Sequence, residues 1–578
     1  MEARETTFGT LLNGRVQYRV PLFQRQYAWQ RKQREQLWSD VLDLYEERRT
    51  GGTAAQHFMG SVVTAPEQLG PNRPSTHTLI DGQQRLTTLT VMLAALRDHI
   101  AEVDEQEAER IDGLYLRNQF PQEASDAFKV LPTQRDRDEY AALIQAGADT
   151  HTSVGLRQTY RYFRDKLRRD EDGEGNPLLP GQLEDTLLQG LGVVSITLGP
   201  NDNPYRVFES LNATGLELRQ IDLIRNLFMM KMGVEQAEHA YTAVWLPMQD
   251  LLGEQFEAFA HDYYLKDGTF LRADDTYTNA KARLESADGA AVVTALEDMS
   301  WFAGRWSRIV RPSREPHRDL SAALTSLGRF GTDTPYPFLL NLFGARGRKN
   351  SISSEAFSEI VRMIEGFLIR RMFANVPTNQ LNRLFIRLWD QLPNAADTVA
   401  NVRQALSESS RRWPPDEFFR EAFVTYPLYT DSQPHQRRLV LDRLEESYGH
   451  REAVALEELQ IEHIVPQTLT DEWRATLGER AEELHQQLAH TPGNLTLTGY
   501  NPQLSNAPWP HKRDFYAASN VSMTRALSTI EVFDANALVA RGQHLAERAA
   551  AIWPGPGRAQ PGAIRILVLH LHNGRRPC

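Results

Sequence analysis

The chain has 578 residues, of which 24% are charged and 41% are hydrophobic, and its formal net charge at pH 7 is −11. A chain of this length exceeds what one hydrophobic core ordinarily supports, so two to four domains are expected. The negative charge argues against a protein that coats nucleic acid through its overall field. A local basic groove stays compatible with it, because salt screens charges beyond about 10 Å.

Two absences in the sequence bear on location. No apolar run approaches the roughly 20 residues that cross a bilayer, so we expect no membrane segment. The start, MEARETTFGTLL, lacks the basic and apolar regions of a secretory signal, and Cys578 is the only cysteine. We therefore predict a cytoplasmic protein without disulfides or thiolate-rich zinc sites.

The pattern of hydrophobic residues predicts a multidomain α+β fold. Short β-like runs and amphipathic helices alternate over residues 1–235, and a nearly all-helical region follows over 236–435. Within residues 436–554, short β-like segments that contain His and Asn lie between helical segments. Residues 555–578 form a tail that is at first rich in Pro, Gly and Arg. No internal repeat of fixed period is found.

A polar segment, Asp81-Gly82-Gln83-Gln84-Arg85, stands between two apolar runs in HTLIDGQQRLTTLTVML. A strand-like run ends at the Asp-Gly turn and a helical pattern follows, so Arg85 is predicted at a helix start. Helix N-termini attract anions and an arginine can grip phosphate oxygens, which makes a phosphate site one interpretation. The alternative is that Asp81 caps the helix and pairs with Arg85, a common structural arrangement.

Four segments in order resemble the N-terminal domain of the GmrSD-type modification-dependent restriction enzymes: YRVPLFQRQYAWQRKQREQLWSDV, HFMGSVV, LIDGQQRLTTLTVML and FESLNATGLELRQIDLIRN. The segment FLIRRMFANVPTNQLNRLF resembles the helical part that follows in this family. The resemblance implies a ParB/sulfiredoxin-like domain that binds and hydrolyses a nucleoside triphosphate, with GTP as one candidate. It places these residues at the nucleotide: Asp81, Gly82, Gln83, Gln84 and Arg85, with Asn212 and Asp222 as weaker candidates.

The segment FQRQYAW permits two interpretations. An arginine flanked by aromatic residues can stack on or clamp nucleic acid. Alternatively Tyr27 and Trp29, two residues apart in a strand, share a face that is usually buried in a core. In relatives that sense phosphorothioate DNA this segment is implicated in detecting the modification, which implies a sensing role for Gln24, Arg25, Tyr27 and Trp29. Other relatives detect sugar-modified cytosine, and the sequence does not choose between the two.

A second group of polar residues lies near the C-terminus. In IEHIVPQ, Glu462 stands beside His463, and GNLTLTGYNPQLSNAPWPHKRDFY follows with Asn494, Asn501, Asn506 and Lys512. A neutral imidazole can take a proton from water near neutral pH, and hard oxygen ligands hold Mg²⁺ or Mn²⁺ against a phosphate. A lone Glu-His pair is usually ordinary surface chemistry, but here the elements of a phosphodiesterase site occur in order.

This order resembles the HNH, or His-Me finger, nucleases with their ββα-metal fold. The resemblance implies that His463 is the general base and that Glu462 and Asn501 bind the divalent metal. Asn494 would orient the histidine, while Asn506 and Lys512 complete the catalytic set, and the choice between Asn501 and Asn506 stays open. The CxxC pairs of zinc-bearing variants are absent, so packing alone must hold this domain.

Residues 156–169, LRQTYRYFRDKLRR, carry two stripes at helical spacing. Leu156, Tyr160, Phe163 and Leu167 predict a core-facing stripe, and a parallel basic stripe, which can track DNA phosphates, consists of Arg157, Arg161, Arg164 and Arg168. The alternative is a solvated face paired with acidic neighbours such as Glu171 and Asp172. Arg370 and Arg371 are a second candidate for DNA contact.

The combined hypothesis is DNA restriction in phage defence, in which a nucleotide controls a metal-dependent nuclease. Nucleotide control requires different contacts to triphosphate and product, because only differential binding shifts a conformational equilibrium. Predicted partners are modified DNA, a nucleoside triphosphate, and either a second copy of the chain or DNA-modification proteins. The alternatives are a catalytically inactive, nucleotide-dependent DNA-binding regulator and a nucleotide-dependent scaffold.

Overall fold

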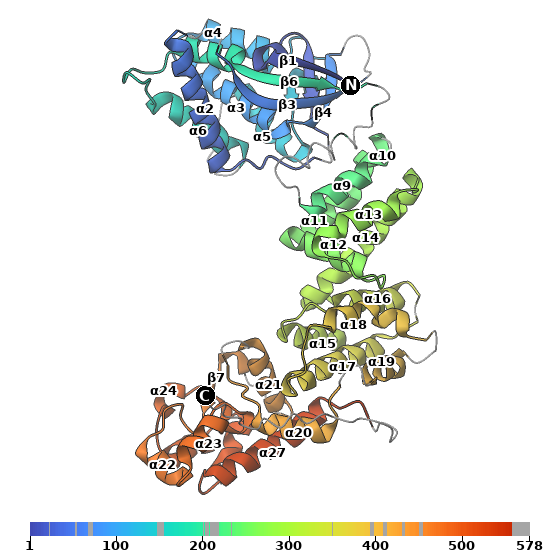
Figure 1. Ribbon diagram of the computed structural model, residues 1–578, viewed down its shortest axis with the longest axis vertical. Helices are drawn as coiled ribbons and strands as arrows, with labels where there is room; N and C mark the ends of the chain where they lie inside the picture. The colour runs from blue at the N-terminus through green and yellow to red at the C-terminus, as the bar shows by residue number, and fades with distance from the viewer. Residues whose placement is uncertain are drawn as a thin grey trace, which may run out of the picture. The chain divides into compact units, whose positions relative to one another are not determined.

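The computed structural model describes the chain apart from these residues: 22–23, 52–54, 68–72, 147–154, 200–201, 203–206, 208–218, 233, 350, 394–397, 409–412, 431–433, 450–454 and 558–578. The chain divides into two compact units. Unit 1 consists of Met1–Pro247 with Tyr277–Glu297, and unit 2 consists of Met248–Thr276 with the described part of Asp298–Cys578. The predicted multidomain α+β fold is confirmed at this level, with helices predominating (Figure 1).

Unit 1 contains a six-stranded mixed sheet in the order β1-β6-β3-β4-β2-β5. Its strands are β1 (Glu2–Thr7), β2 (Val16–Arg19), β3 (His57–Pro66), β4 (Ser75–Asp81), β5 (Val130–Leu131) and β6 (Leu191–Thr197). Strands β4 and β5 both run parallel to β2, and β6 runs parallel to β3, while β1 and β3 are antiparallel to β6 and β4 respectively. The carboxyl ends of β4, β2 and β5 therefore meet at one edge of the sheet.

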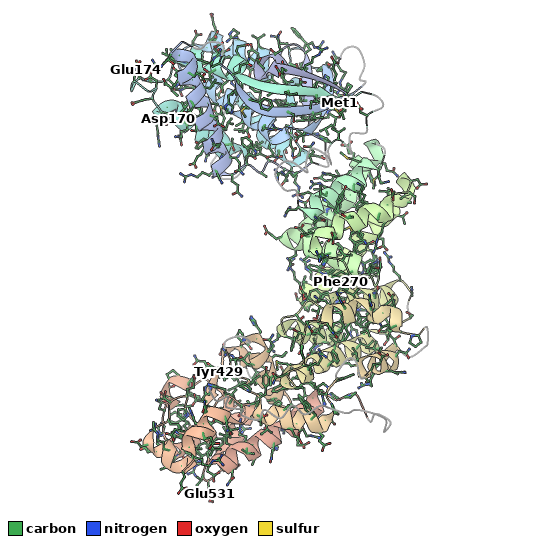
Figure 2. The ribbon with its side chains drawn as sticks, viewed as in Figure 1. Met1, Asp170, Glu174, Phe270, Tyr429 and Glu531 are labelled. Carbon is green, nitrogen blue, oxygen red and sulfur yellow. The ribbon has the colours of Figure 1, made fainter. Side chains whose placement is uncertain are left out.

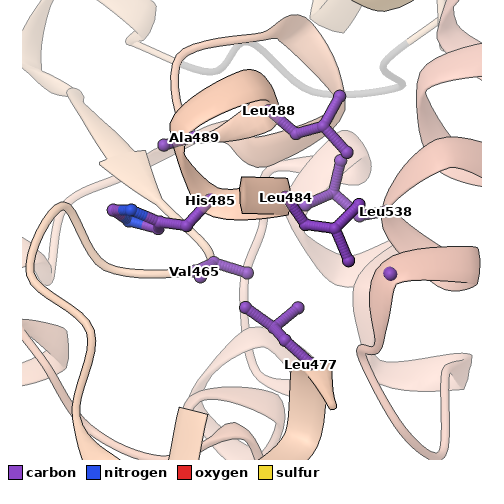
Figure 3. A pocket seen from close by; sticks show the side chains of 8 residues that line it. Val465, Leu477, Leu484, His485, Leu488, Ala489 and Leu538 are labelled. Carbon is purple, nitrogen blue, oxygen red and sulfur yellow. The ribbon is translucent and has the colours of Figure 1, made fainter. Parts of the chain in front are cut away.

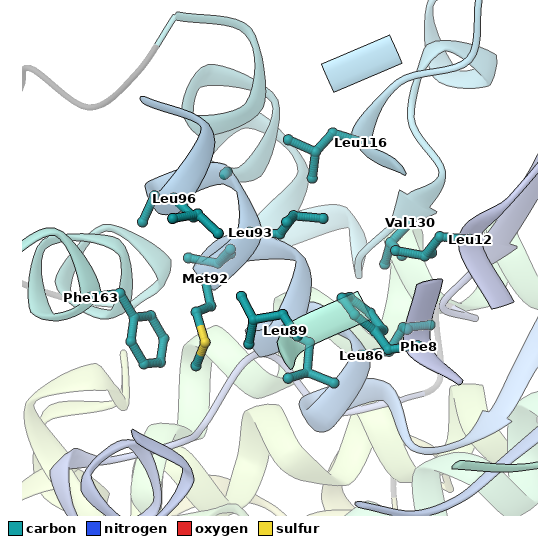
Figure 4. Close-up of a cluster of buried hydrophobic side chains, with 14 of the residues drawn as sticks. Phe8, Leu12, Leu86, Leu89, Met92, Leu93, Leu96, Leu116, Val130 and Phe163 are labelled. Atoms are coloured by element: carbon teal, nitrogen blue, oxygen red, sulfur yellow. The ribbon is translucent and has the colours of Figure 1, made fainter. Parts of the chain in front are cut away.

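The helices of unit 1 supply most of its core. They are α1 (Phe8–Leu12), α2 (Arg31–Arg49), α3 (Gln83–Ile100), α4 (Glu105–Ile111), α5 (Gln134–Ala146), α6 (Leu156–Arg169), α7 (Pro180–Asp185), α9 (Gln220–Met230), α10 (Val234–Ala240) and α13 (Thr276–Leu284). Helix α3 is buried along nearly its whole length, since its sequence is apolar on every side. Its leucines pack with Phe8, Leu12 and Val130 from the sheet side and Phe163 from α6 (Figure 4).

Unit 2 is built almost entirely of helices. They are α11 (Leu246–Leu252), α12 (Phe256–Leu265), α14 (Gly289–Val310, which belongs to unit 2 from Asp298 onward), α15 (Arg318–Arg329), α16 (Tyr336–Gly347), α17 (Ser354–Phe373), α18 (Leu381–Leu388), α19 (Thr398–Ser407), α20 (Asp416–Thr425), α21 (Pro434–Glu446), α22 (Asp471–Leu477), α23 (Ala481–Leu488), α24 (Asn501–Leu504), α25 (Trp509–Ala517), α26 (Ser522–Arg525) and α27 (Ala535–Ile552). One antiparallel hairpin, β7 (Gln460–His463) with β8 (Leu495–Thr498), interrupts the helices. None of the helices in the described chain is long and apolar enough to cross a membrane.

Arg370 and Arg371 lie inside unit 2, which contradicts the prediction that they contact DNA. The side chain of Arg370 is completely buried on α17. Its guanidinium donates hydrogen bonds to the carbonyl oxygens of Trp553 (2.7 Å) and Pro414 (3.0 Å) and pairs with Asp416 at 2.5 Å. These contacts join α17 to α20 and to the end of α27, so the arginine serves the core.

Candidate functional site

Three segments gather at the edge of the sheet where β4, β2 and β5 end. The DGQQR motif follows β4, residues 24–29 follow β2, and Thr133 to Arg137 follow β5. Helices α3 and α5 begin at this edge, so their N-terminal N–H groups lie there too. Ligands of sheets with parallel strands usually bind outside the carboxyl ends of the strands.

Glutamine side chains connect the DGQQR motif to residues 24–29. Gln24 Nε2 donates to the carbonyl oxygens of Leu79 (2.6 Å) and Ile80 (2.9 Å). Gln83 Nε2 donates to the carbonyl oxygen of Arg25 (3.2 Å). Gln84 Nε2 donates to the carbonyl oxygen of Gln26 (3.2 Å), and Gln84 Oε1 accepts from the N–H of Ala28 (2.8 Å). The segment predicted to sense DNA modification and the motif predicted to bind nucleotide are thus one hydrogen-bonded structure. A shift in either one changes the surroundings of the other.

Arg85 is held by strand β3 as well as by its own motif. Its guanidinium donates to the carbonyl oxygens of Met59 (2.7 Å) and Ser61 (2.8 Å) and pairs with Asp81 at 3.2 Å. The Asp81–Arg85 pair is one half of the structural alternative that the residues alone suggested. The other half is wrong, because the N-cap of α3 is Gly82 and no side chain caps this helix. The side chain of Arg85 remains 27% exposed, so it can also reach a ligand at the sheet edge.

Gly60 makes room for Arg85 where the pairing of β3 with β6 is irregular. Its φ of +93° lies in the left-handed region, and a Cβ built on it would stand 1.9 Å from Arg85 Nη1. We expect Gly60→Ala to cost about 1–2 kcal/mol for the backbone and about 1 kcal/mol more for each carbonyl bond that Arg85 loses. Thermal unfolding of the full chain measures the sum.

Gly14→Ala is the matched control for this substitution. Gly14 also has a positive φ, +77°, but nothing lies within 4 Å of a Cβ built there. The two variants share the backbone strain, so the difference between their unfolding free energies reports the displacement of Arg85. Equal destabilisation by both variants would show that Arg85 contributes nothing through Met59 and Ser61.

The remaining residues of the predicted sensor differ in their exposure to solvent. Tyr27 and Trp29 are partly buried against the core of unit 1, and the hydroxyl of Tyr27 lies 2.9 Å from Thr88 Oγ1. This is the packing role that their spacing suggested as an alternative. The guanidinium of Arg25, in contrast, has no hydrogen bond or ion pair with any residue in the described chain. Arg25 is therefore the member of the segment that is available to an anionic ligand.

Two weaker nucleotide candidates fall elsewhere. Asn212 lies outside the described residues. Asp222 is buried in the first turn of α9, with Arg225 at 3.1 Å and Arg219 at 3.5 Å from its carboxylate. Its position within this ion-pair group favours a structural role in unit 1.

Helix α6 shows the two predicted stripes. Leu156, Tyr160, Phe163 and Leu167 are all buried, so the core-facing stripe is confirmed. On the basic side, Arg164 and Arg168 both pair with Glu102, at 2.5 and 2.6 Å, and the backbone N–H of Arg157 donates to Glu139. Arg161 lies half-buried on the same helix. Acidic neighbours thus neutralise part of the stripe, though they are not Glu171 and Asp172.

In unit 2, the β7–β8 hairpin brings the second predicted group together. Asn494 directly precedes β8 and is completely buried. Its Oδ1 accepts from the N–H of Val465 (2.7 Å), and its Nδ2 donates to the carbonyl oxygens of Val465 and Ala489, both at 2.8 Å. Asn494 therefore fixes the chain immediately after His463, as a residue that orients this histidine must do.

His463 ends β7 with its ring largely enclosed by polar and aromatic groups. Its Nε2 lies 3.3 Å from His490 Nδ1, its Nδ1 lies 3.4 Å from Gln467 Nε2, and Tyr429 packs edge-on at 4.5 Å between ring centroids (Figure 2 labels Tyr429). Burial, and next the neighbouring His490 and Lys512, lowers the pKa of His463 to about 3. The ring is therefore neutral near pH 7, but a pKa this low also makes it a weak proton acceptor in these surroundings.

Glu462, the predicted metal ligand, forms a buried ion pair with Lys512. Their charged atoms are 2.6 Å apart, and Lys512 Nζ also donates to the carbonyl oxygen of His463 at 2.8 Å. Asn501, at the start of α24, lies beside β7 with its Nδ2 3.5 Å from the carbonyl oxygen of Ile461. Asn506 is exposed in the turn that follows α24.

These donors do not fit a preassembled metal site. The carboxylate of Glu462 is already bonded to an ammonium group, and a cation at this position would have to displace it. Within the described part of the chain, no three His, Cys, Asp or Glu residues are grouped so as to hold a metal ion. The described structure thus places a neutral His463 beside an ion pair that occupies the predicted metal ligand.

Two cavities of the described structure are lined by other residues. A small cavity next to the hairpin has apolar walls, with the ring of His485 at its margin (Figure 3), and its volume of about 10 Å³ suits one water at most. A wider hollow of about 690 Å³ lies over β1, β6 and the exposed Phe58 in unit 1. Its lining includes neither the DGQQR motif nor residues 24–29.

Comparison with protein-family models matches two stretches of the chain. Residues 8–229 match the model described as GmrSD restriction endonuclease, N-terminal domain. Residues 413–548 match the model described as GmrSD restriction endonucleases, C-terminal domain. The first stretch contains the DGQQR motif and strands β2 to β6, and the second contains the β7–β8 hairpin with His463. No match was found among curated proteins.

Proposed function

The chain belongs to the GmrSD family of restriction endonucleases, and from this premise we propose that it hydrolyses DNA at His463 under the control of a nucleotide bound by unit 1. Membership in the family makes restriction of foreign DNA its role in defence. The sensing of a DNA modification, the control by a nucleotide and the nuclease mechanism are the parts that we propose.

The observation that carries the nuclease proposal is the neutral, oriented ring of His463. An amide nitrogen can only donate, so the contact from Gln467 makes Nδ1 of His463 the acceptor and leaves the ring proton on Nε2, directed at His490. A water molecule that takes the place of the exposed Gln467 amide would give its proton to Nδ1 while it attacks phosphorus. Asn494 keeps the strand end, and with it the ring, in place for this transfer.

A divalent ion, expected from the HNH resemblance, is a separate question. The carboxylate of Glu462 is already paired with Lys512. The ion would therefore have to bind together with the DNA, through phosphate oxygens and the neutral side-chain oxygen of Asn501. Nicking assays with Mg²⁺, Mn²⁺ and EDTA test this requirement. Full activity in EDTA would reject it.

A nucleoside triphosphate, with GTP as one candidate, is proposed at the edge where β4, β2 and β5 end. Support comes from Arg25, whose guanidinium is unpaired in the described structure, from the partly exposed Arg85, and from the N-terminus of α3, whose first turn contains no acidic residue. Because Gln83 and Gln84 bond to residues 24–29, a triphosphate and its product would place this segment differently. Nucleotide state and DNA sensing are then coupled.

The coupling predicts that nucleotide changes the nicking rate. The experiment incubates the full chain with Mg²⁺ and matched unmodified, phosphorothioate and sugar-modified plasmids, with triphosphate, diphosphate or neither. We expect one of the modified plasmids to be nicked at a different rate from the unmodified plasmid. We also expect the nicking rate of that plasmid to differ between the triphosphate and diphosphate reactions. Identical rates across the three nucleotide conditions would reject the coupling, and identical rates across the plasmids would reject modification sensing.

The closed Glu462–Lys512 pair favours one alternative, a catalytically inactive DNA-binding regulator. The two functions differ in what His463 does for a cell under phage attack. Full protection by the His463→Ala variant in a plating assay would support the regulator, and loss of protection supports the nuclease.

A further inference from the structure

A dense group of arginines lies on the helical part of unit 2, far in sequence from every residue assigned above. The C-terminal half of α14 and the turn after it carry an arginine at every third position: Arg305, Arg308, Arg311 and Arg314. The end of α16 adds Arg346 and Arg348 (α14 and α16 are labelled in Figure 1). These six residues, here called the basic patch, stand in a chain whose net charge is −11.

Contacts within the basic patch hold several of its guanidinium groups in fixed positions. Glu315, whose side chain is completely buried, pairs with Arg308 at 3.3 Å and with Arg346 at 2.9 Å. Arg305 and Arg348 both stack on the ring of Trp301, at 3.8 and 4.3 Å from its centroid. Cations fixed in this way lose little side-chain entropy when they bind a ligand, which favours binding over mere solvation.

Two carboxylates lie among the six arginines: Glu315 pairs with Arg308 and Arg346, and Asp298 pairs with Arg348. Arg311 and Arg314 are exposed, and neither pairs with a carboxylate in the described chain. Arg318 and Lys349, also exposed, extend the group at its margins. Burial lowers the pKa of Arg305 to about 10, and the positive charges of Arg308 and Arg348 contribute further. An anionic partner would offset the repulsion between these like charges.

The arginines of this stretch belong to two short segments, because α14 ends at Val310 and Pro312–Arg314 form a separate helical turn. Guanidinium groups bind phosphate through paired hydrogen bonds, and the patch consists of arginine throughout.

We propose that the basic patch binds the sugar-phosphate backbone of duplex DNA and holds it on unit 2 independently of sequence. The proposal rests on DNA being the substrate of this chain, and it adds a contact surface outside the nuclease hairpin. Contacts to phosphate position a protein on a duplex without reading bases, so the patch contributes affinity and not choice of modification.

The test measures DNA binding in the His463→Ala background, so that cutting does not interfere. Fluorescence anisotropy with a fluorescein-labelled, unmodified duplex is recorded over a series of salt concentrations for the parent and for Arg311→Glu/Arg314→Glu. We expect Kd at low salt to rise about tenfold or more, and the slope of log K against log salt to fall by about 2. The control, Arg362→Glu/Arg387→Glu, changes the same charge at two exposed arginines outside the patch.

The outcomes separate this proposal from the proposed nuclease. Equal affinity and equal salt slopes for the patch and control variants would overturn the assignment, whether or not the wild-type chain nicks DNA. Binding that depends on the patch in a chain that never nicks would count against the nuclease alone. If the first variant is unfolded by circular dichroism, Arg314→Glu/Lys349→Glu replaces it, because both side chains are exposed.

Discussion

Substitution of His463 by alanine is expected to lower the rate constant for plasmid nicking by about 10²- to 10⁴-fold, the usual contribution of a general base. The reason is the loss of the neutral Nδ1 that would accept the proton of the attacking water, while Asn494 and the β7–β8 hairpin stay in place. Single-turnover nicking of a supercoiled plasmid measures the rate constant.

The matched control for this substitution is His544→Ala, which removes an exposed imidazole from α27. It is expected to nick at nearly the parent rate. Both variants should keep the parent's thermal unfolding midpoint within a few degrees, since a slow but unfolded variant would say nothing about catalysis. A folded His463→Ala variant that nicks at the rate of His544→Ala would remove His463 from the mechanism.

The second large effect is expected from Lys512→Met. This change leaves the carboxylate of Glu462 buried without its partner, which typically costs about 3–5 kcal/mol. The double variant Glu462→Gln/Lys512→Met removes the stranded charge and should recover much of the loss. Urea unfolding of the full chain, followed through the transition of unit 2, gives the free energies.

Arg480→Met is the control for loss of an ion pair. Arg480 pairs with Glu483 at 2.7 Å on the surface of the same unit, so its removal should leave the unfolding midpoint nearly unchanged. A loss in Lys512→Met as small as that in Arg480→Met would mean that Glu462 is not effectively buried. Stabilisation of Lys512→Met by Mn²⁺, absent in the double variant, would identify Glu462 as a metal ligand once Lys512 has moved away.

Local periodicity predicted those parts of the fold in which neighbouring residues decide the outcome. The apolar stripe of α6 is buried as its spacing requires, and the turn at Gly82 leads into α3 as the Asp-Gly pair suggested. The ionic partners of α6 could not be read in this way. Glu102 reaches Arg164 because α3 packs against α6, and the nearest acids in the sequence, Glu171 and Asp172, do not take that place.

In the polar sites, too, the sequence predicted some contacts and missed those that depend on residues distant in the chain. Asn494 lies beside the chain that follows His463, because β7 and β8 pair antiparallel although α22 and α23 stand between them in the chain, and the order of the motif indicates this pairing. The partner of Glu462 was not foreseen, because Lys512 is brought to β7 by helix α25, fifty residues further along the chain. The prediction that Arg370 contacts DNA was wrong for a related reason. An arginine on an apolar helix can be buried when carbonyl oxygens from distant parts of the chain accept its hydrogen bonds, as those of Trp553 and Pro414 do.

A restriction nuclease can damage the DNA of its own cell. Its rate of DNA cleavage in the absence of the correct target therefore matters as much as its maximal rate. His463 exposes only 6% of its surface, and the amide of Gln467 lies against the nitrogen that would accept a proton. If His463 is the base that we propose, water reaches its Nδ1 only after the side chain of Gln467 has moved. The rate of spontaneous cutting would then be low in the absence of bound DNA, without a separate inhibitor protein.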